Sequence, residues 1–172
     1  MNEVIRNIKE RRSIRAYKNE QITDAQLDAI LEAGSYAASG MGTQSTVLVA
    51  VQDPETIAMM SGLNAKVMGA DIDPFYGAPT VVIVFADAAE TATPVEDGSL
   101  VIGNLMLAAF SEGVDSCWVH RAKEVFETEE GKALKEKWGL ADNYIGVGNC
   151  ILGYRDGELP EAPARKPGRI IK

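Results

Sequence analysis

Hydrophobic residues near the N-terminus recur at the spacing of a helix. Three of them share one face of a short helix whose other face is charged, namely Val4, Ile5 and Ile8. A second helix is predicted to begin after Thr23, because Thr23 and Gln26 form a capping-box pair, and to end near Gly34. The first helix therefore delivers the residues from Arg11 onward at its C-terminal end.

Continuous apolar runs predict strands further along the chain. The run Thr46–Val51 is typical of a buried strand, and the β-branched run Thr80–Ala86 is typical of a central one. Two later runs, Ser116–His120 and Tyr144–Leu152, complete a set of four predicted strands.

Helical segments separate these strands, at 54–63, 96–113 and 129–138. The segment 96–113 is the longest, and nine apolar residues between 100 and 110 surround it on nearly every side. A helix that is apolar all round is buried all round, so this one is either the central core element or is covered partly by another subunit. The predicted order is α, α, β, α, β, α, β, α, β, followed by an irregular arm over 157–172.

Length and composition indicate one domain over residues 1–172, large enough to form a core without disulfides or metals. Cys117 and Cys150 are the only cysteines, no apolar stretch reaches the length of a membrane span, and the N-terminus is charged, so we expect a cytoplasmic protein without a membrane partner. The net charge of −8 and the few aromatic residues argue against nucleic acid as a partner.

The basic residues are distributed unevenly along this acidic chain. Residues 1–18 carry six basic and two acidic groups, residues 164–172 carry four basic groups and no acid, and the 145 residues between them carry seven basic and twenty-three acidic groups. Two positive ends on a negative body are consistent with terminal segments that converge on one phosphate. The alternative is that the basic ends are solvated or pair with surface acids.

The run Arg11-Arg12-Ser13-Ile14-Arg15 is the most informative part of this distribution. Cations are favoured at the C-terminus of a helix by its dipole, which accounts for some of the arginines. Ser13 and Arg15 lie beyond the helix and need another explanation. Guanidinium groups bind phosphate in a bidentate manner and a serine hydroxyl adds one hydrogen bond, so an anion site is indicated.

Catalytic side-chain sets are largely absent. His120 is the only histidine, and on a strand it points to the face opposite Cys117, which disfavours a Cys-His pair and excludes a site of several histidines for a metal. Gly40-x-Gly42 precedes a strand, whereas a dinucleotide fingerprint follows one. A protein short of acids, bases and nucleophiles suits a bound redox cofactor that carries the chemistry.

Four segments in order along the chain resemble the nitroreductase family of flavoproteins. They are Arg11-Arg12-Ser13-Ile14-Arg15 after the first helix, 38–44, Gly77-Ala78-Pro79 before a strand, and 113–118 after the long helix. The resemblance runs along essentially the whole chain, which is similar to the short members of that family.

This resemblance implies an α+β fold, a three-layer sandwich with a central mixed, mainly antiparallel sheet flanked by helices. It implies an FMN-dependent oxidoreductase that is a homodimer with flavins at its interface and uses NADH or NADPH as reductant. A ping-pong reaction would then reduce a small-molecule acceptor such as a nitroaromatic or a quinone. The alternative is a flavin-binding storage or sensor protein without turnover, and the two differ in whether the flavin is open to a second ligand.

The resemblance also assigns cofactor-binding residues and no obligatory catalytic side chain or metal. The FMN phosphate and ribityl chain are assigned to Arg11, Arg12, Ser13 and Arg15, completed by Arg165 and Lys166. A loop that approaches the flavin largely from the partner subunit is assigned to Ser39, Gly40, Met41 and Gln44. The pyrimidine edge of the ring is assigned to Asn64 and Lys66, and the segment beside flavin N5 and O4 to Trp118, Val119, His120 and Arg121, with the backbone of His120 nearest N5.

Two departures from the family pattern bear on function. Relatives often have prolines and an asparagine where this chain has Ala38, Gly42 and Ser45-Thr46. Many relatives also carry Glu-Gly where His120-Arg121 stand here, so the mouth of the site is expected to be more basic in this protein.

Overall fold

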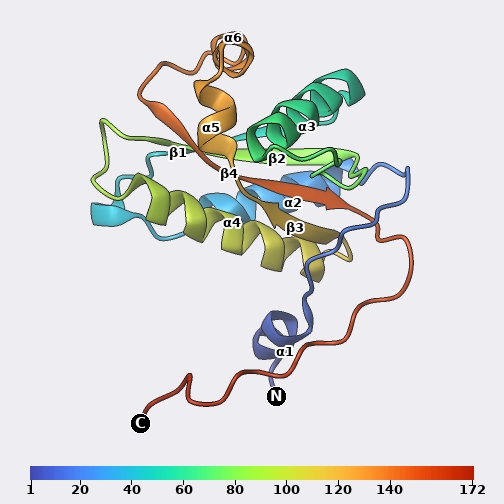
Figure 1. Cartoon of the computed structure of the whole chain (residues 1–172). Helices are drawn as coiled ribbons and strands as arrows, with labels where there is room; N and C mark the ends of the chain where they lie inside the picture. The colour runs from blue at the N-terminus through green and yellow to red at the C-terminus, as the bar shows by residue number, and fades with distance from the viewer.

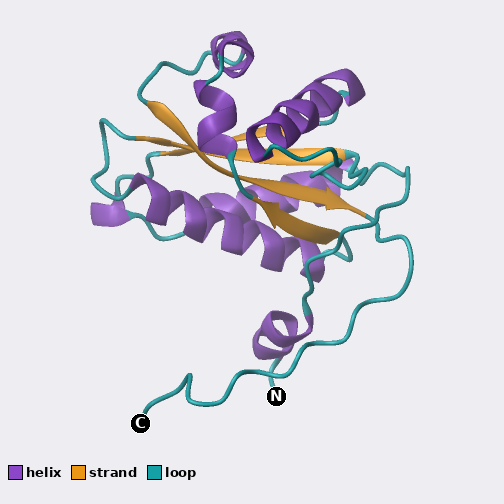
Figure 2. Cartoon of the chain, in the orientation of Figure 1, coloured by secondary structure: helices purple, strands orange, loops and turns teal.

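A computed structural model describes all 172 residues and contains one four-stranded sheet (Figures 1 and 2). The elements in chain order are α1 (Glu3–Glu10), α2 (Asp24–Ser35), the 3-10 turn η1 (Gly40–Gly42), β1 (Thr46–Val51), α3 (Pro54–Met68), β2 (Thr80–Asp87), α4 (Pro94–Ser111), β3 (Asp115–Val119), α5 (Ala122–Glu127), α6 (Glu129–Lys137) and β4 (Tyr144–Gly153). The strand order is β1-β2-β4-β3, and every neighbouring pair is antiparallel.

The sheet is covered by helices on both faces, which makes three layers (Figure 1). α2 and α4 lie on one face, and α3 and α5 lie on the other with α6 beyond α5 (Figure 1). Strand β2 is buried at all eight positions, and its side chains alternate between the layers: Val81 and Ile83 pack with α3 and α5, whereas Val82 and Val84 pack with α4. The α+β three-layer prediction is confirmed.

The predicted parallel component of the sheet is reduced to one contact. No strand pair is parallel, and the single parallel bridge joins Ser13, in the segment after α1, to Ser116 of β3. This contact holds the arginine-rich segment against the free edge of the sheet.

Most predicted elements are present, with three differences. β1 is an edge strand in which only Val51 is buried, because nothing pairs with its outer side, so its interpretation as a buried strand was wrong. α3 extends five residues beyond the predicted end, to Met68, and stops at Gly69 in the left-handed conformation. α5 was missed, because its six residues are too few to show a helical period.

Apolar faces of two helices stay exposed in the single chain. The face of α1 that carries Val4, Ile5 and Ile8 is uncovered, and α1 has no buried residue. α4 is buried along Val101 and Leu105 but not all round, because other apolar residues of the helix, including Leu100, face outward. The arm 157–172 is mostly exposed and contains no helix or strand, and it runs past α1 (Figure 1).

The segment after α1 and the residues after β4 both contact β3. The Asp115 carboxylate, whose side chain is only 4% exposed, accepts hydrogen bonds from Nη1 of Arg155 at 2.9 and 3.2 Å and from the Arg155 backbone N–H at 3.3 Å. The backbones of Tyr17 and Arg155 form an isolated antiparallel β-bridge, and the Ile14 N–H donates to the Ser116 carbonyl at 3.0 Å. This junction fixes the base of the C-terminal arm beside the segment that follows α1.

The loop between α2 and β1 is fixed at the start of α4. Asp97, in the first turn of α4, accepts hydrogen bonds from the Gly40 N–H at 2.9 Å and from the hydroxyls of Thr91 and Thr93 at 2.9 and 3.0 Å. These hydrogen bonds hold the pKa of the Asp97 carboxyl below its usual range, and the bond from the Gly40 N–H has the largest effect. Gly40 is required here, because a Cβ at this position would lie 2.3 Å from the Thr93 hydroxyl.

Replacing Asp115 by Asn tests the junction at β3. The variant is expected to lose about 2 kcal/mol of unfolding free energy in urea denaturation, because it removes a charge-assisted pair with a buried member. Glu129→Gln, which breaks the exposed pair with Lys132, is the control and is expected to cost less than about 0.5 kcal/mol. Equal losses in the two variants would contradict a structural role of the Asp115–Arg155 pair.

The Asp97 hydrogen bonds make a defined contribution to the pH dependence of stability. Because the folded pKa is lowered, this contribution is complete above the unfolded value of about 3.9 and is lost as the pH falls through the folded value. We therefore expect the stability difference between the wild type and Asp97→Asn, measured by urea denaturation, to shrink between pH 6 and pH 3. A constant difference across that range would show that the charge of Asp97 is not what the hydrogen bonds stabilise.

Candidate functional site

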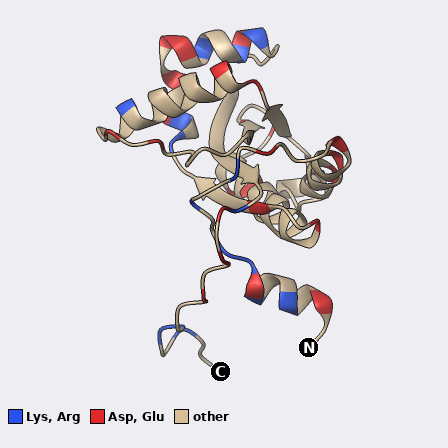
Figure 3. Ribbon diagram, turned by 90° about the vertical axis from the view of Figure 1, so that its right-hand side faces the viewer, with Lys and Arg blue, Asp and Glu red and all other residues tan.

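The predicted basic cluster lines a cleft formed by the segment after α1 and the C-terminal arm. The cleft has a volume of about 740 Å³ and brings together Arg11, Arg12, Ser13, Arg15 and Arg165. Figure 3 shows basic residues gathered in these two segments, which lie on the same side of the molecule. Residues 150 positions apart in sequence are thus brought together as predicted, although Lys166 lies on the exposed arm and does not line the cleft.

The guanidinium groups of this cleft lack acidic partners. Arg11, Arg12, Arg15 and Arg165 form no ion pair, and Glu161, which also lines the cleft, pairs with none of them. Nη1 of Arg11 and Nε of Arg12 are buried without a hydrogen-bond partner. Because buried donors are nearly always satisfied, these atoms indicate an anionic ligand.

Part of the cluster has a structural role. Nη1 of Arg12 donates to the carbonyls of Lys9 and Arg11 at 2.7 and 2.6 Å, and so satisfies the C-terminal end of α1. This is the helix-terminus contribution expected from the sequence. Ser13 and Arg15 have no such role.

A second cavity, called here the ring pocket, adjoins the cleft through Arg15. It has a volume of about 240 Å³ and is lined by Arg15, Asn64, Met68, Pro74, Tyr76, Cys117, Trp118, Val119, His120 and Arg121. Arg15 lines both cavities, so the cleft and the ring pocket are neighbours that share this residue. Five predicted residues, Asn64 and 118–121, meet here, whereas Lys66 is exposed on α3 and lies outside the pocket.

Asn64 joins α3 to the segment after β3. Its Nδ2 donates to the His120 carbonyl at 2.9 Å, which fixes the backbone of this segment. Its Oδ1 is buried without a partner, and the residue is 1% exposed. The ring pocket therefore offers one buried acceptor that a ligand donor can satisfy.

The backbone around the ring pocket is strained at two positions. Arg121 has φ 77° and Tyr76 has φ 53°, both in the left-handed region that favours glycine. Non-glycine residues held in this region occur preferentially at functional sites.

Cys117 and His120 both line the ring pocket but do not form a catalytic pair. The Cys117 Sγ donates to the Trp118 carbonyl at 3.4 Å, and no hydrogen bond joins it to His120. Burial raises the pKa of the Cys117 thiol, against the opposing effect of Arg15 and of a hydrogen bond with Ser13. A neutral, buried thiol is a poor nucleophile.

The predicted partner loop, Ser39, Gly40, Met41 and Gln44, lies at the opposite end of α4 from α1. The Gly40 N–H donates to Asp97 at the start of α4, whereas Asn7 Nδ2 of α1 donates to the Leu107 carbonyl near its end at 3.2 Å. An 18-residue helix is about 27 Å long. Met41 and Gln44 also have left-handed φ values of 56° and 51°, and Met41 is fully exposed.

Several lining residues were not predicted. Pro74 and Tyr76 belong to the turn 74–79 that the sequence predicts before β2, but only Gly77-Ala78-Pro79 of it enters the family resemblance. Met68 lies beyond the predicted end of α3 and has no sequence signal.

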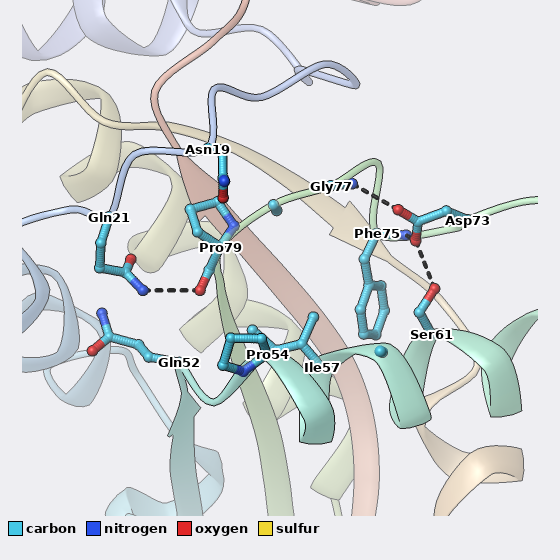
Figure 4. Close-up of a pocket in the computed structure, with 12 residues that line it drawn as sticks. Asn19, Gln21, Gln52, Pro54, Ile57, Ser61, Asp73, Phe75, Gly77 and Pro79 are labelled. Carbon is cyan, nitrogen blue, oxygen red and sulfur yellow. Dashed lines mark hydrogen bonds between the residues drawn. The ribbon is translucent and has the colours of Figure 1, made fainter.

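A further cavity of about 550 Å³ lies between α3 and the turn before β2 (Figure 4). Its polar groups are largely satisfied within the protein. Gln21 Nε2 donates to the Pro79 carbonyl, and the Asp73 carboxylate accepts from Ser61 and from the N–H groups of Phe75 and Gly77 (Figure 4). No residue predicted to bind a cofactor lines this cavity.

No helix has both the length and the hydrophobicity needed to cross a membrane. No three His, Cys, Asp or Glu side chains lie close enough together to hold a metal ion.

Known proteins with similar sequences and structures agree on one family. The model of the nitroreductase family matches residues 8–154. A protein of Archaeoglobus fulgidus, provisionally named NADH dehydrogenase/NAD(P)H nitroreductase, is 33% identical over 90% of this chain and 86% of its own. The NADPH-flavin oxidoreductase of Vibrio harveyi is 29% identical over 99% of this chain and 73% of its own.

A solved structure agrees along the whole length. The crystal structure of a nitroreductase with bound FMN from Bacteroides fragilis superposes with a TM-score of 0.91, at 33% identity, over 100% of this chain and 99% of that one. The fold, the match over residues 8–154 and these relatives together show that the chain belongs to the nitroreductase family.

Proposed function

We propose that this protein is an FMN-dependent NAD(P)H oxidoreductase. The observation that carries the proposal is that Arg15 is shared by a cleft of guanidinium groups without acidic partners and a pocket with an unsatisfied buried acceptor. A flavin mononucleotide has a phosphate at one end and a planar ring with N–H donors at the other. The B. fragilis relative with bound FMN and the NADPH-flavin oxidoreductase of V. harveyi support the same assignment.

The residues of the cleft would hold the phosphate. Arg11 contributes the buried Nη1, Arg15 contributes its guanidinium group, and Ser13 contributes a hydroxyl. Arg165, whose Nε and Nη2 donate to the Pro163 carbonyl at 3.1 and 2.7 Å, contributes its positive charge and its remaining donors. Charge-assisted hydrogen bonds of this kind are about twice as strong as neutral ones. Glu161 in the same cleft disfavours a second anion beside the first.

The residues of the ring pocket would orient the flavin. The Asn64 Oδ1 can accept a ring N–H, and its Nδ2 holds the His120 backbone in place. Bound FMN supplies the ability to accept a hydride from NADH or NADPH and to pass two electrons to a second molecule. Proximity and a fixed polar environment are the contributions of the protein, and no side-chain acid or base is required.

A ping-pong sequence is part of this proposal. The sequence has no dinucleotide fingerprint, which is consistent with a reductant and an acceptor that occupy the same place beside the flavin in turn. The acceptor is a small oxidised molecule such as a nitroaromatic or a quinone.

Assembly as a homodimer would complete this site. The loop 39–44 lies at the opposite end of α4 from α1, so in a homodimer it could approach the phosphate end of the flavin from the second chain. The uncovered apolar residues of α1 and Leu100 of α4 would be buried in such a dimer.

The visible spectrum tests the proposed function directly. The purified protein is expected to show flavin absorbance near 450 nm, to bleach on anaerobic addition of NADH or NADPH, and to recover on addition of menadione. Colour without bleaching by either nucleotide would instead identify a flavin-binding protein without turnover.

Substitution in the cleft tests the assignment of the phosphate. Arg15→Gln and Arg165→Gln are each expected to weaken FMN binding by about 1.5 to 3 kcal/mol, measured by fluorescence titration of the apoprotein, because each removes a charge-assisted hydrogen bond. Lys18→Gln, an exposed basic residue of the same segment outside both cavities, is the control. Unchanged affinity in both arginine variants would refute the assignment.

A further inference from the structure

The ring pocket has a charge opposite to that of the protein as a whole. Arg15 and Arg121 carry permanent positive charges, His120 adds imidazole nitrogen atoms, and no acidic residue lines the pocket. The whole chain has a net charge of −8. A pocket that is locally positive on an otherwise acidic protein favours the binding of anions.

Arg121 is the cation that the proposed phosphate site leaves free. Arg15 lines both cavities and is assigned to the phosphate, whereas Arg121 lines the ring pocket alone. Arg121 forms no ion pair with any carboxylate.

The backbone at Arg121 would favour another residue. With φ 77°, this position is less strained for glycine than for arginine. The side chain does not contribute a hydrogen bond to the fold, since only the backbone carbonyl of Arg121 is used, as acceptor for the Val125 N–H. Arg121 thus places a long cationic side chain beside the pocket from a left-handed backbone conformation that is unfavourable for it, and its charge has no structural partner.

Trp118 provides an apolar surface beside this charge. Its side chain is half exposed, and its ring centroid lies 5.5 Å from that of His120. Gly148 of β4 lets the indole lie on the sheet, because a Cβ there would be 2.6 Å from its Nε1. An indole fixed on one side and open on the other is suited to stacking on an aromatic ring.

We infer that, with the flavin beside the backbone of 118–121, the side chains of this segment face the acceptor, and that the acceptor site prefers planar aromatic molecules that carry an anionic group, a carboxylate or a sulfonate. Arg121 and His120 would then bind the anion and Trp118 would contact the ring. This inference rests on the proposed function and specifies its acceptor. For a nitroaromatic carboxylate, NAD(P)H and one proton reduce the nitro group to nitroso, with release of NAD(P)⁺ and water. Two electrons and two hydrogens are thereby transferred, and the carboxylate is unchanged.

A pair of acceptors that differ in charge but hardly in shape tests this preference. We expect the holoenzyme to reduce 4-nitrobenzoate with a higher kcat/KM than 4-nitrobenzamide. Because Arg121 also lines the proposed flavin pocket, the ratio of the two kcat/KM values is the readout, and Arg121→Gln should lower the preference for 4-nitrobenzoate over 4-nitrobenzamide about tenfold, the scale of one charge-assisted hydrogen bond. Arg121→Lys, which keeps the charge, should retain most of the preference.

Lys123→Gln is the matched control. It removes one positive charge two residues away, from an exposed position outside the pocket, and should leave both acceptors unaffected. A change in the 4-nitrobenzoate value equal to that of Arg121→Gln would mean that net charge, rather than a contact, sets the preference, and would overturn the inference.

Binding without turnover gives an independent measurement. Titration calorimetry of the oxidised holoprotein with 4-methylbenzoate, which cannot be reduced, should show a dissociation constant about tenfold weaker in Arg121→Gln than in the wild type. His120→Gln should weaken binding less, because it removes no permanent charge. Equal affinities in the wild type and Arg121→Gln would overturn the inference.

The outcomes distinguish the inference from the proposed function. If the wild type reduces neither acceptor, the oxidoreductase assignment fails. If it reduces both without preference, or if Arg121→Gln changes kcat/KM for NADPH and not for 4-nitrobenzoate, the oxidoreductase assignment stands and the anion bound by Arg121 is not that of the acceptor.

Discussion

The buried carboxylate of Asp115 is the constraint on which the arrangement of both chain ends depends. A carboxylate that is 4% exposed at the edge of a sheet needs a partner, and Arg155 supplies one with both its guanidinium and its backbone N–H. Arg155 lies at the point where the C-terminal arm leaves β4. The neighbouring Ser116 carbonyl meanwhile accepts the Ile14 N–H. One short stretch of β3 therefore fixes the origin of two otherwise unsupported segments.

The position of the basic cleft follows from this junction. Ser13 and Arg15 flank the residue that bonds to β3, and the arm that carries Arg165 begins at the ion pair. At the other end of β3, Trp118 and Val119 begin the ring pocket, and Arg15 reaches both cavities. The sheet edge thus determines the spacing between the basic cleft and the ring pocket.

The sequence predicted the central strands and helices well, because a strand buried on both faces is continuously apolar and a capped helix start has a recognisable residue pair. The β-branched run of β2 and the capping box of α2 are both present in the structure. β1 was misjudged because edge strands can be as apolar as central ones, and the position in the sheet depends on pairing that no local pattern contains. In the site, the arginine cluster was visible as a departure from net charge, whereas Tyr76 and Met68 reach the ring pocket only through tertiary packing.

The exposed apolar residues have a common explanation in the same geometry. α1 is held to the body at the end of α4 and leaves Val4, Ile5 and Ile8 uncovered, while Asp97 holds the loop with Met41 at the start of α4. A single chain cannot bring the two ends of one helix together. In the proposed twofold dimer each chain would place its loop at the arginine segment of the other. The apolar residues of α1, which are costly to expose in an isolated chain, would be buried there.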